Sequence, residues 1–249
     1  PIATPAEKIM DAVEAIRKSV IGAFTFEFSE RSKDIKVIEI KPPTYEAYQQ
    51  YFSGIDIFNK SAGTEGLEYF DRAYALDTLF VSALLYSFSY YQNLGLRSKA
   101  DSVIQFLNGR RSHLNSFQQL LLDEGISVMS GDRIKALIIA REIAEISPTD
   151  LFIYGWSRQA FFTNHPREAI EALERIDLES YSMRGWIPYW NFLTASYHAL
   201  GDYENELQAS QMSRQLYPND ISTLSDEMRA LAAMGKFDGV RECLTIYAT

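Results

Sequence analysis

Residues 187–220 read IPYWNFLTASYHALGDYENELQASQMSRQLYPND, and this 34-residue stretch decides the fold. Its marker positions carry bulky apolar residues, a glycine and a proline, namely Trp190, Leu193, Tyr197, Gly201, Tyr203 and Pro218. The next window repeats the frame with Leu224, Leu231, Gly235 and Phe237. A repeat of this length predicts stacked helical hairpins, because one hairpin cannot bury its apolar face alone.

The same frame extends back to Thr44. We expect six repeats, with spacings of 34, 36, 33, 37 and 34 residues, that begin at about Ala47, Val81, Phe117, Asp150, Ile187 and Ile221. Position 20 of each frame is where two helices cross closely, so it favours small residues. Three repeats carry alanine there: Ala100, Ala136 and Ala169. The first and fifth repeats carry Gly66 and Glu206, so the repeats are not uniform.

The N-terminal segment has a different pattern. β-Branched residues recur there at helical spacing: Ile9, Val13, Ile16 and Val20. They predict a helix from about Pro5 to Ala23. Residues 24–28 alternate apolar and polar, and residues 35–40 form a β-branched run, so a short β-hairpin is compatible with this part. Pro42-Pro43 then ends the segment.

The chain is therefore divided into two regions by these patterns. Residues 1–43 form an N-terminal helix plus a possible hairpin, which would be the end of a preceding region. Residues 44–249 form the repeat solenoid.

The marker residues of the fifth repeat resemble the tetratricopeptide repeat consensus, and the resemblance covers residues 44–249. It implies an all-α fold, an α-α superhelix of about six helical hairpins. Such repeat stacks usually present a concave binding surface. The expected function is therefore protein or peptide binding, without enzymatic activity.

A second resemblance is local. Residues 42–54, from Pro42-Pro43-Thr44-Tyr45 to Gly54, are similar to the opening of the repeat region in a group of bacterial signalling proteins. Those proteins carry an N-terminal kinase, nucleotide cyclase or winged helix-turn-helix output domain, often followed by a membrane span and a TolB-like region. None of the output-domain motifs occurs in this sequence.

Composition limits the partners. With 33 acidic and 24 basic residues, the formal charge is -9, which argues against a nucleic-acid partner and favours basic or neutral peptides. No apolar run is long enough to cross a bilayer, so no direct membrane insertion is expected. The chain begins at Pro1 without methionine, and we interpret it as a processed or trimmed piece. The compartment is open; we favour the periplasmic side of a membrane-anchored protein over the cytoplasm.

No pattern of catalytic, metal-binding or cofactor-binding residues is found. The histidines are His113, His165 and His198, and no two have the spacing of metal ligands. There is no glycine-rich phosphate loop and no nucleophile motif. The single cysteine, Cys243, lies in an apolar pattern and is expected to be a packed thiol. We expect no catalytic residues, no metal and no cofactor.

Candidate binding residues follow from the frame, since certain positions of each first helix line the concave face. They are Tyr48, Tyr51, Phe58, Gln92, Asn93, Gln118, Tyr154, Arg158, Phe161, Asn191, His198 and Arg229. Tyrosine and arginine often anchor partners, and amide side chains can satisfy a peptide backbone. The alternative is that distortion of the repeats buries some of the aromatic residues against the N-terminal helix.

Two further features bear on partners. The carboxylate clamp of chaperone-binding tetratricopeptide domains needs lysine, asparagine and arginine where this chain has Tyr51, Ile55, Tyr86 and Gln118, so that ligand is rejected. At the C-terminus, Val240, Leu244 and Tyr247 form an apolar edge without a polar capping helix, which suggests self-association.

The most specific functional interpretation is that the chain is a sensor or scaffold arm of a larger bacterial signalling or transcription-regulatory protein. Two alternatives stay open. One is a stand-alone assembly factor that uses the same groove. The other is a small-molecule sensor that uses an aromatic groove.

Overall fold

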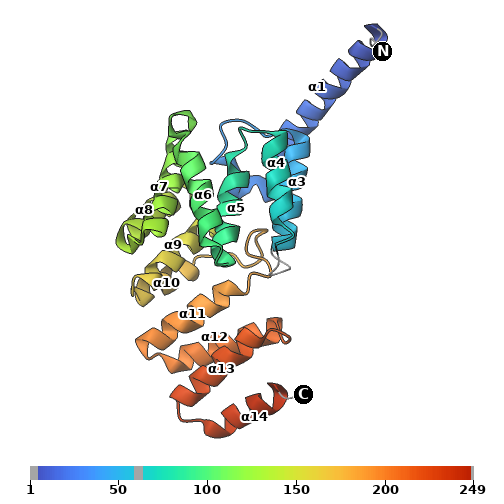
Figure 1. Ribbon diagram of the computed structural model, residues 1–249. Coiled ribbons are helices and arrows are strands. Elements are labelled where there is room, and N and C mark those ends of the chain that lie inside the picture. Colours follow the sequence, from blue (N-terminus) through green and yellow to red (C-terminus); the bar gives the residue numbers. More distant parts are fainter. Residues whose placement is uncertain (1–4, 59–63, 248–249) are drawn as a thin grey trace. The chain divides into compact units, whose positions relative to one another are not determined.

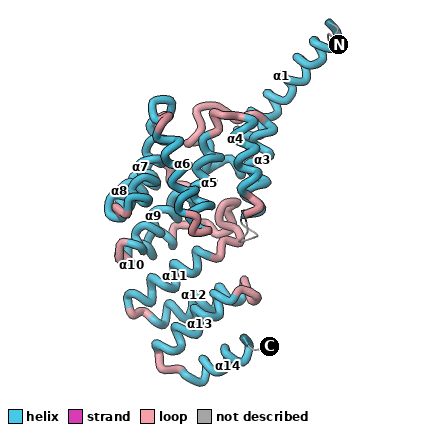
Figure 2. Tube along the Cα trace, viewed as in Figure 1, coloured by secondary structure: helices cyan, strands magenta, loops and turns pink. Residues whose placement is uncertain are grey.

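A computed structural model describes residues 5–58 and 64–247. Contacts within the chain separate it into two compact units, Pro1–Ser130 and Gly131–Thr249, and each unit is considered by itself (Figure 1). In the described residues all regular structure is helical, with no strand (Figure 2). The expected all-α, tetratricopeptide-like fold of adjacent helical hairpins is therefore confirmed.

Unit 1 combines the N-terminal segment with the first hairpins. Its elements are α1 (Pro5–Phe28), η1 (Glu30–Ser32), α2 (Lys33–Lys36), α3 (Tyr45–Phe58), α4 (Leu67–Leu76), α5 (Val81–Asn93), α6 (Arg97–Asn108), η2 (Arg111–His113) and α7 (Ser116–Ser130). Helix α3 packs against α4, and α5 packs against α6, so each pair forms one hairpin.

Unit 2 continues the series. Its helices are α8 (Arg133–Ile146), α9 (Asp150–Phe162), α10 (Pro166–Leu173), α11 (Pro188–Leu200), α12 (Tyr203–Leu216), α13 (Ile221–Ala233) and α14 (Phe237–Tyr247). The hairpins are α9/α10, α11/α12 and α13/α14, and α11 also contacts both α9 and α13. The first helices of these hairpins therefore lie next to one another.

The predicted frame is confirmed by the helix starts. Every first helix begins within two residues of its predicted position; α5, α9 and α13 begin at the predicted residue. The turn between the two helices of a hairpin explains why the fifth repeat has a glycine at Gly201. Gly201 ends α11 in the left-handed region, with φ of 73°, and Asn164 takes the corresponding position after α9, with φ of 62°. Glycine and asparagine are the residues that adopt this conformation most readily.

The β-hairpin prediction is wrong, because α1 continues to Phe28 and residues 33–36 form α2. The alternation at residues 24–28 also fits a helix, since Phe24 and Phe28 are four residues apart and their rings lie 4.5 Å from each other. Phe26 points elsewhere and is buried. In the second run, Ile35 and Ile38 are buried three residues apart, which is a helical spacing.

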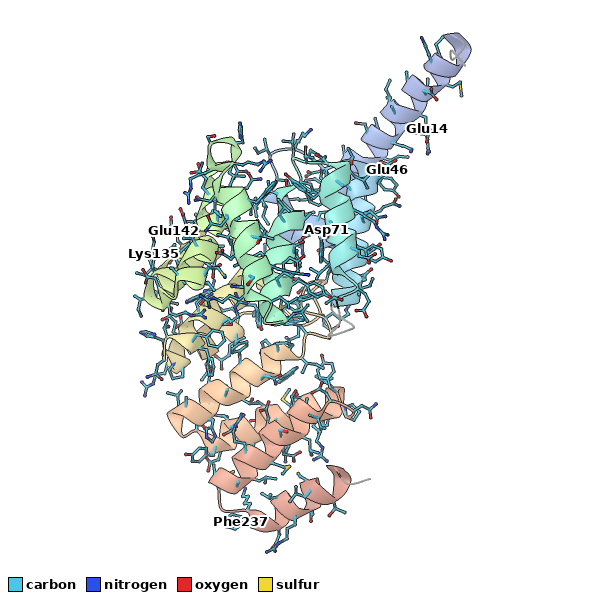
Figure 3. All side chains as sticks on the ribbon, viewed as in Figure 1. Glu14, Glu46, Asp71, Lys135, Glu142 and Phe237 are labelled. Carbon is cyan, nitrogen blue, oxygen red and sulfur yellow. The ribbon has the colours of Figure 1, made fainter. Side chains whose placement is uncertain are left out.

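The N-terminal segment packs onto the repeats of unit 1. The Ser32 hydroxyl and the Tyr48 hydroxyl are 3.2 Å apart. Lys18 pairs with Glu46 on α3 at 2.7 Å; Glu46 is labelled in Figure 3. Further along, the buried Glu39 accepts hydrogen bonds from Ser82 at the start of α5. The division of the chain at residue 43 stays a prediction, while the compact unit includes residues on both sides of it.

The outer part of α1 is different from this packed end. Its predicted apolar residues lie at the surface, where Ile9, Val13, Ile16 and Val20 are each more than half exposed. Among the described residues, no helix has the length and apolarity required to cross a membrane.

Candidate partner-binding site

The first helices of unit 2 present a half-exposed cluster that we call the α9/α11 aromatic face. It consists of Arg158, Phe161 and Phe162 from α9 and Asn191 and Phe192 from α11. The ring of Phe192 lies 5.2 Å from Phe161 and 5.6 Å from Phe162. Phe162 is 52% exposed, and the other four are partly exposed. Aromatic rings with this much free surface are typical of protein-binding sites.

Tyr154 forms the floor of this face and not its surface. It belongs to the core of unit 2, with its ring 6.0 Å from both Trp186 and Phe192. Burial raises the pKa of its hydroxyl, with a smaller opposing effect from Arg158. Tyr154, which was predicted to contact a partner directly, is instead buried and supports the ring of Phe192.

Beside Arg133 of α8, whose guanidinium lies 5.4 Å from the centroid of the Phe162 ring, Arg158 is the other cation of the face. It is partly exposed, and within the described part of the chain it forms no ion pair. Its buried Nε has no hydrogen-bond partner there either. A guanidinium with unused donors can bind a carboxylate or a peptide carbonyl.

His198 and Arg229, which were predicted to lie in the groove, are instead held by a fully buried carboxylate. Glu206 accepts from Arg229 Nε at 2.7 Å, and its other oxygen lies 2.8 Å from His198 Nδ1. Arg229 also donates to Asp226, at 2.8 Å, and Asp226 accepts from Thr194. Burial raises the pKa of Asp226, against the opposing effect of Arg229. This network joins α11, α12 and α13, so its main role is structural.

The sequence marked Glu206 as an exception at its repeat position but did not identify its partners. It occupies position 20, where alanine stands in other repeats, and a buried carboxylate there requires cationic partners. Glu168 of α10 is a second carboxylate that is held by side chains of other helices. It accepts from Trp156 Nε1 at 2.6 Å and from Arg141 at 2.7 Å. Burial opposes ionisation of Glu168, but these hydrogen bonds leave its pKa lowered.

In unit 1 the predicted residues do not form one surface. Tyr51 is fully buried among the rings of Phe52, Phe70, Phe80 and Tyr86. Tyr48 is buried as well, with its hydroxyl next to Ser32 of η1, which lies beyond the end of the N-terminal helix α1. These two tyrosines pack in the core and offer a partner no free surface.

The other predicted residues of unit 1 lie at different places. Phe58 is half-buried against Tyr90, with ring centroids 4.5 Å apart. Gln92 lies near Met129, and Asn93 is exposed at the end of α5. Gln118 is buried at the start of α7 and lines a separate pocket.

The described residues contain no group of three or more histidine, cysteine, aspartate or glutamate side chains that could hold a metal ion. Cys243 is buried, as expected of a packed thiol, and it lies 3.7 Å from Arg214 Nη1.

Comparison with known proteins adds little to this description. No protein-family model matches the chain, and no curated protein matches it. Among solved structures, one described as the crystal structure of MamA protein aligns at 14% identity with a TM-score of 0.37. The alignment covers 81% of this chain and 90% of the other. A likeness at this level carries no argument about function, so the fold assignment rests on the helical hairpins themselves.

Proposed function

We propose that the chain is a protein- or peptide-binding module and that the α9/α11 aromatic face of unit 2 is its partner-binding site. The observation that carries this proposal is the combination of half-exposed Phe161 and Phe192 with an arginine that has no ion-pair partner in the described structure. Burial of two aromatic side chains and a charge-assisted hydrogen bond would supply the binding free energy.

The test is site-specific photocrosslinking in the source cells. A photoreactive phenylalanine analogue at Phe162, which is exposed beside Phe192, should give a crosslinked species of defined mass. The same analogue at Met212, exposed on α12, is the control position. Equal capture at both positions would show that contact is not specific to the aromatic face.

A charge-reversal pair makes the test sharper. Arg158→Glu should remove the crosslinked species, because its carboxylate would repel the group that the guanidinium binds. Arg167→Glu makes the same charge change at an exposed position on α10 and should leave capture intact. Unchanged capture with Arg158→Glu would move the site away from this face.

We further propose that this module is a sensor or scaffold arm of a larger bacterial signalling or transcription-regulatory protein. The support is the local resemblance of residues 42–54. An antibody against this chain should then detect a band well above 28.4 kDa in the membrane fraction of the source cells. A band near 28.4 kDa in the soluble fraction would favour the stand-alone assembly factor instead.

A further inference from the structure

Unit 1 contains a pocket of about 480 Å³ at the side of the α5/α6 hairpin. Its inner wall is made of buried apolar side chains, among them Val81, Leu107 and Leu114. Its outer wall includes Tyr74 and Phe106, from α4 and α6. Small-molecule sites are typically concavities of roughly 300–1,000 Å³ with mostly apolar walls, so both the size and the lining fit a bound ligand.

The formally charged side chains that line this pocket are Lys41 and Arg110, and both are basic. His113 also lines it, and no aspartate or glutamate is among the lining residues. Within the described residues, none of the three forms an ion pair. The Arg110 guanidinium lies over the Phe106 ring, 3.7 Å from its centroid, which keeps its charge beside the apolar wall. In a chain with a net charge of -9, this rim is locally suited to an anion.

Gln118 adds a polar group inside the pocket. Its Oε1 accepts from the Asn115 backbone N–H at 3.0 Å, and the Asn115 side-chain oxygen accepts from the Gln118 backbone N–H at 2.7 Å. This reciprocal pair caps α7 and fixes the orientation of the amide. Gln118 is only 1% exposed and lines the pocket, so its amide is a nearly buried polar group in an otherwise mostly apolar wall. Its side-chain NH₂ group can donate a hydrogen bond to a ligand oxygen.

We propose that this pocket binds a small amphipathic carboxylate, with its apolar chain against Leu107 and Leu114. The carboxylate would receive hydrogen bonds from Arg110 and Lys41, and one oxygen would accept from Gln118 Nε2. The site lies in unit 1 and does not rest on the partner-binding face proposed above.

The test is isothermal titration calorimetry of the whole chain with three eight-carbon probes: octanoate, 1-octanol and octylammonium. Octanoate should bind saturably with one site. Octanol should bind about tenfold more weakly, since it lacks the charge-assisted hydrogen bonds, and octylammonium should not bind. In parallel, the side-chain NH₂ signals of Gln118 in ¹H–¹⁵N spectra should shift with octanoate.

Three variants locate the site. Arg110→Gln and Lys41→Gln change exposed residues and should each weaken octanoate binding about tenfold. Gln118→Glu keeps the oxygen that caps α7 but replaces the donor with an anionic oxygen, so it should abolish binding. Lys135→Gln, which makes the same charge change on α8, should bind as the wild type does (Figure 3).

Several outcomes would overturn the proposal. They are the absence of saturable octanoate binding, equal binding of octanol and octanoate, and wild-type affinity in both Arg110→Gln and Lys41→Gln. Because those two positions are on the surface, they decide the question even where Gln118→Glu fails to fold. Tighter binding of a peptide with a C-terminal leucine carboxylate than of octanoate would assign the pocket to a protein terminus instead.

Discussion

A buried glutamate in unit 1 gives the sharpest quantitative prediction. Glu39 Oε1 accepts from the Ser82 backbone N–H at 2.7 Å and from the Ser82 hydroxyl at 2.6 Å, at the first turn of α5. Burial raises the pKa of Glu39 to about 7 from the ordinary value of 4.5, despite these hydrogen bonds, and Asp77 adds to the effect. The folded protein therefore holds this proton more tightly than the unfolded chain does.

The sign of the pH dependence follows from this difference. In the unfolded chain Glu39 releases its proton near pH 4.5, whereas in the folded chain it does so near pH 7. The stability that it contributes is fully present below about pH 4.5 and is lost as the pH rises through about 7. Between about pH 5 and about pH 8 the loss amounts to about 2.5 kcal/mol of unfolding free energy.

The perturbation is Glu39→Gln, which keeps the oxygen that Ser82 binds and removes the titration. Urea unfolding followed by circular dichroism at both pH values should show a decrease in the wild type that exceeds the variant's decrease by about 2.5 kcal/mol. All three tryptophans lie in unit 2, so their fluorescence transition is the internal reference. Parallel pH dependence in both proteins, with a Glu39 carboxyl titration near 4.5 by ¹³C NMR, would refute the reasoning.

Three other predictions concern packing and burial. Gly54→Ala should lower the free energy of unfolding by about 1–3 kcal/mol, because the new Cβ would lie 2.9 Å from the Phe70 ring of α4. Gly155→Ala should raise it by about 0.5–1 kcal/mol, because there is open space around this helical glycine. A change of the midpoint temperature of thermal unfolding in the same direction for both variants would contradict this. Arg229→Met should lower the free energy of unfolding, followed by tryptophan fluorescence, by about 3 kcal/mol, because the buried Glu206 carboxylate loses this partner. The double variant with Glu206→Ala should recover most of this stability, and a double variant as unstable as Arg229→Met would contradict the explanation. Since burial raises the pKa of Cys243, native protein should react with iodoacetamide far more slowly than urea-unfolded protein, and equal rates would exclude a packed thiol.

The helical scaffold could be predicted because its markers are local requirements. The glycine that ends α11 needs a left-handed backbone, and the alanine at position 20 needs a close helix crossing, so both types recur at a fixed spacing. Ala100, Ala136 and Ala169 are accordingly buried without any exposed surface. These requirements placed each first helix within two residues of its observed start.

The candidate site was harder to predict because the same side chain can serve a core or a surface. Tyr51 and Phe161 were both assigned to the concave face, from positions 5 and 12 of their repeats, yet Tyr51 is enclosed by rings from three helices and Phe161 is partly exposed. Which of them is free depends on the packing of neighbouring hairpins, and that information is not local. The strand prediction for residues 24–28 was wrong for a related reason, since five residues are too few to distinguish a strand from a helix.

Net charge is a poor guide to the partners of this chain, because several of its charges are not on the surface. Glu206 and Glu39 are buried, and each is bound by groups of a neighbouring helix. Each adds one negative charge to the formal count of -9, but Glu206 is offset by its pairing with Arg229, and the raised pKa of Glu39 leaves it partly protonated near neutral pH. The accessible charge of both proposed sites is positive instead, with Arg158 in unit 2 and Arg110 in unit 1. The expectation of basic or neutral partners stays a prediction for the surface as a whole, whereas each proposed site favours an anionic or carbonyl group next to an apolar side chain.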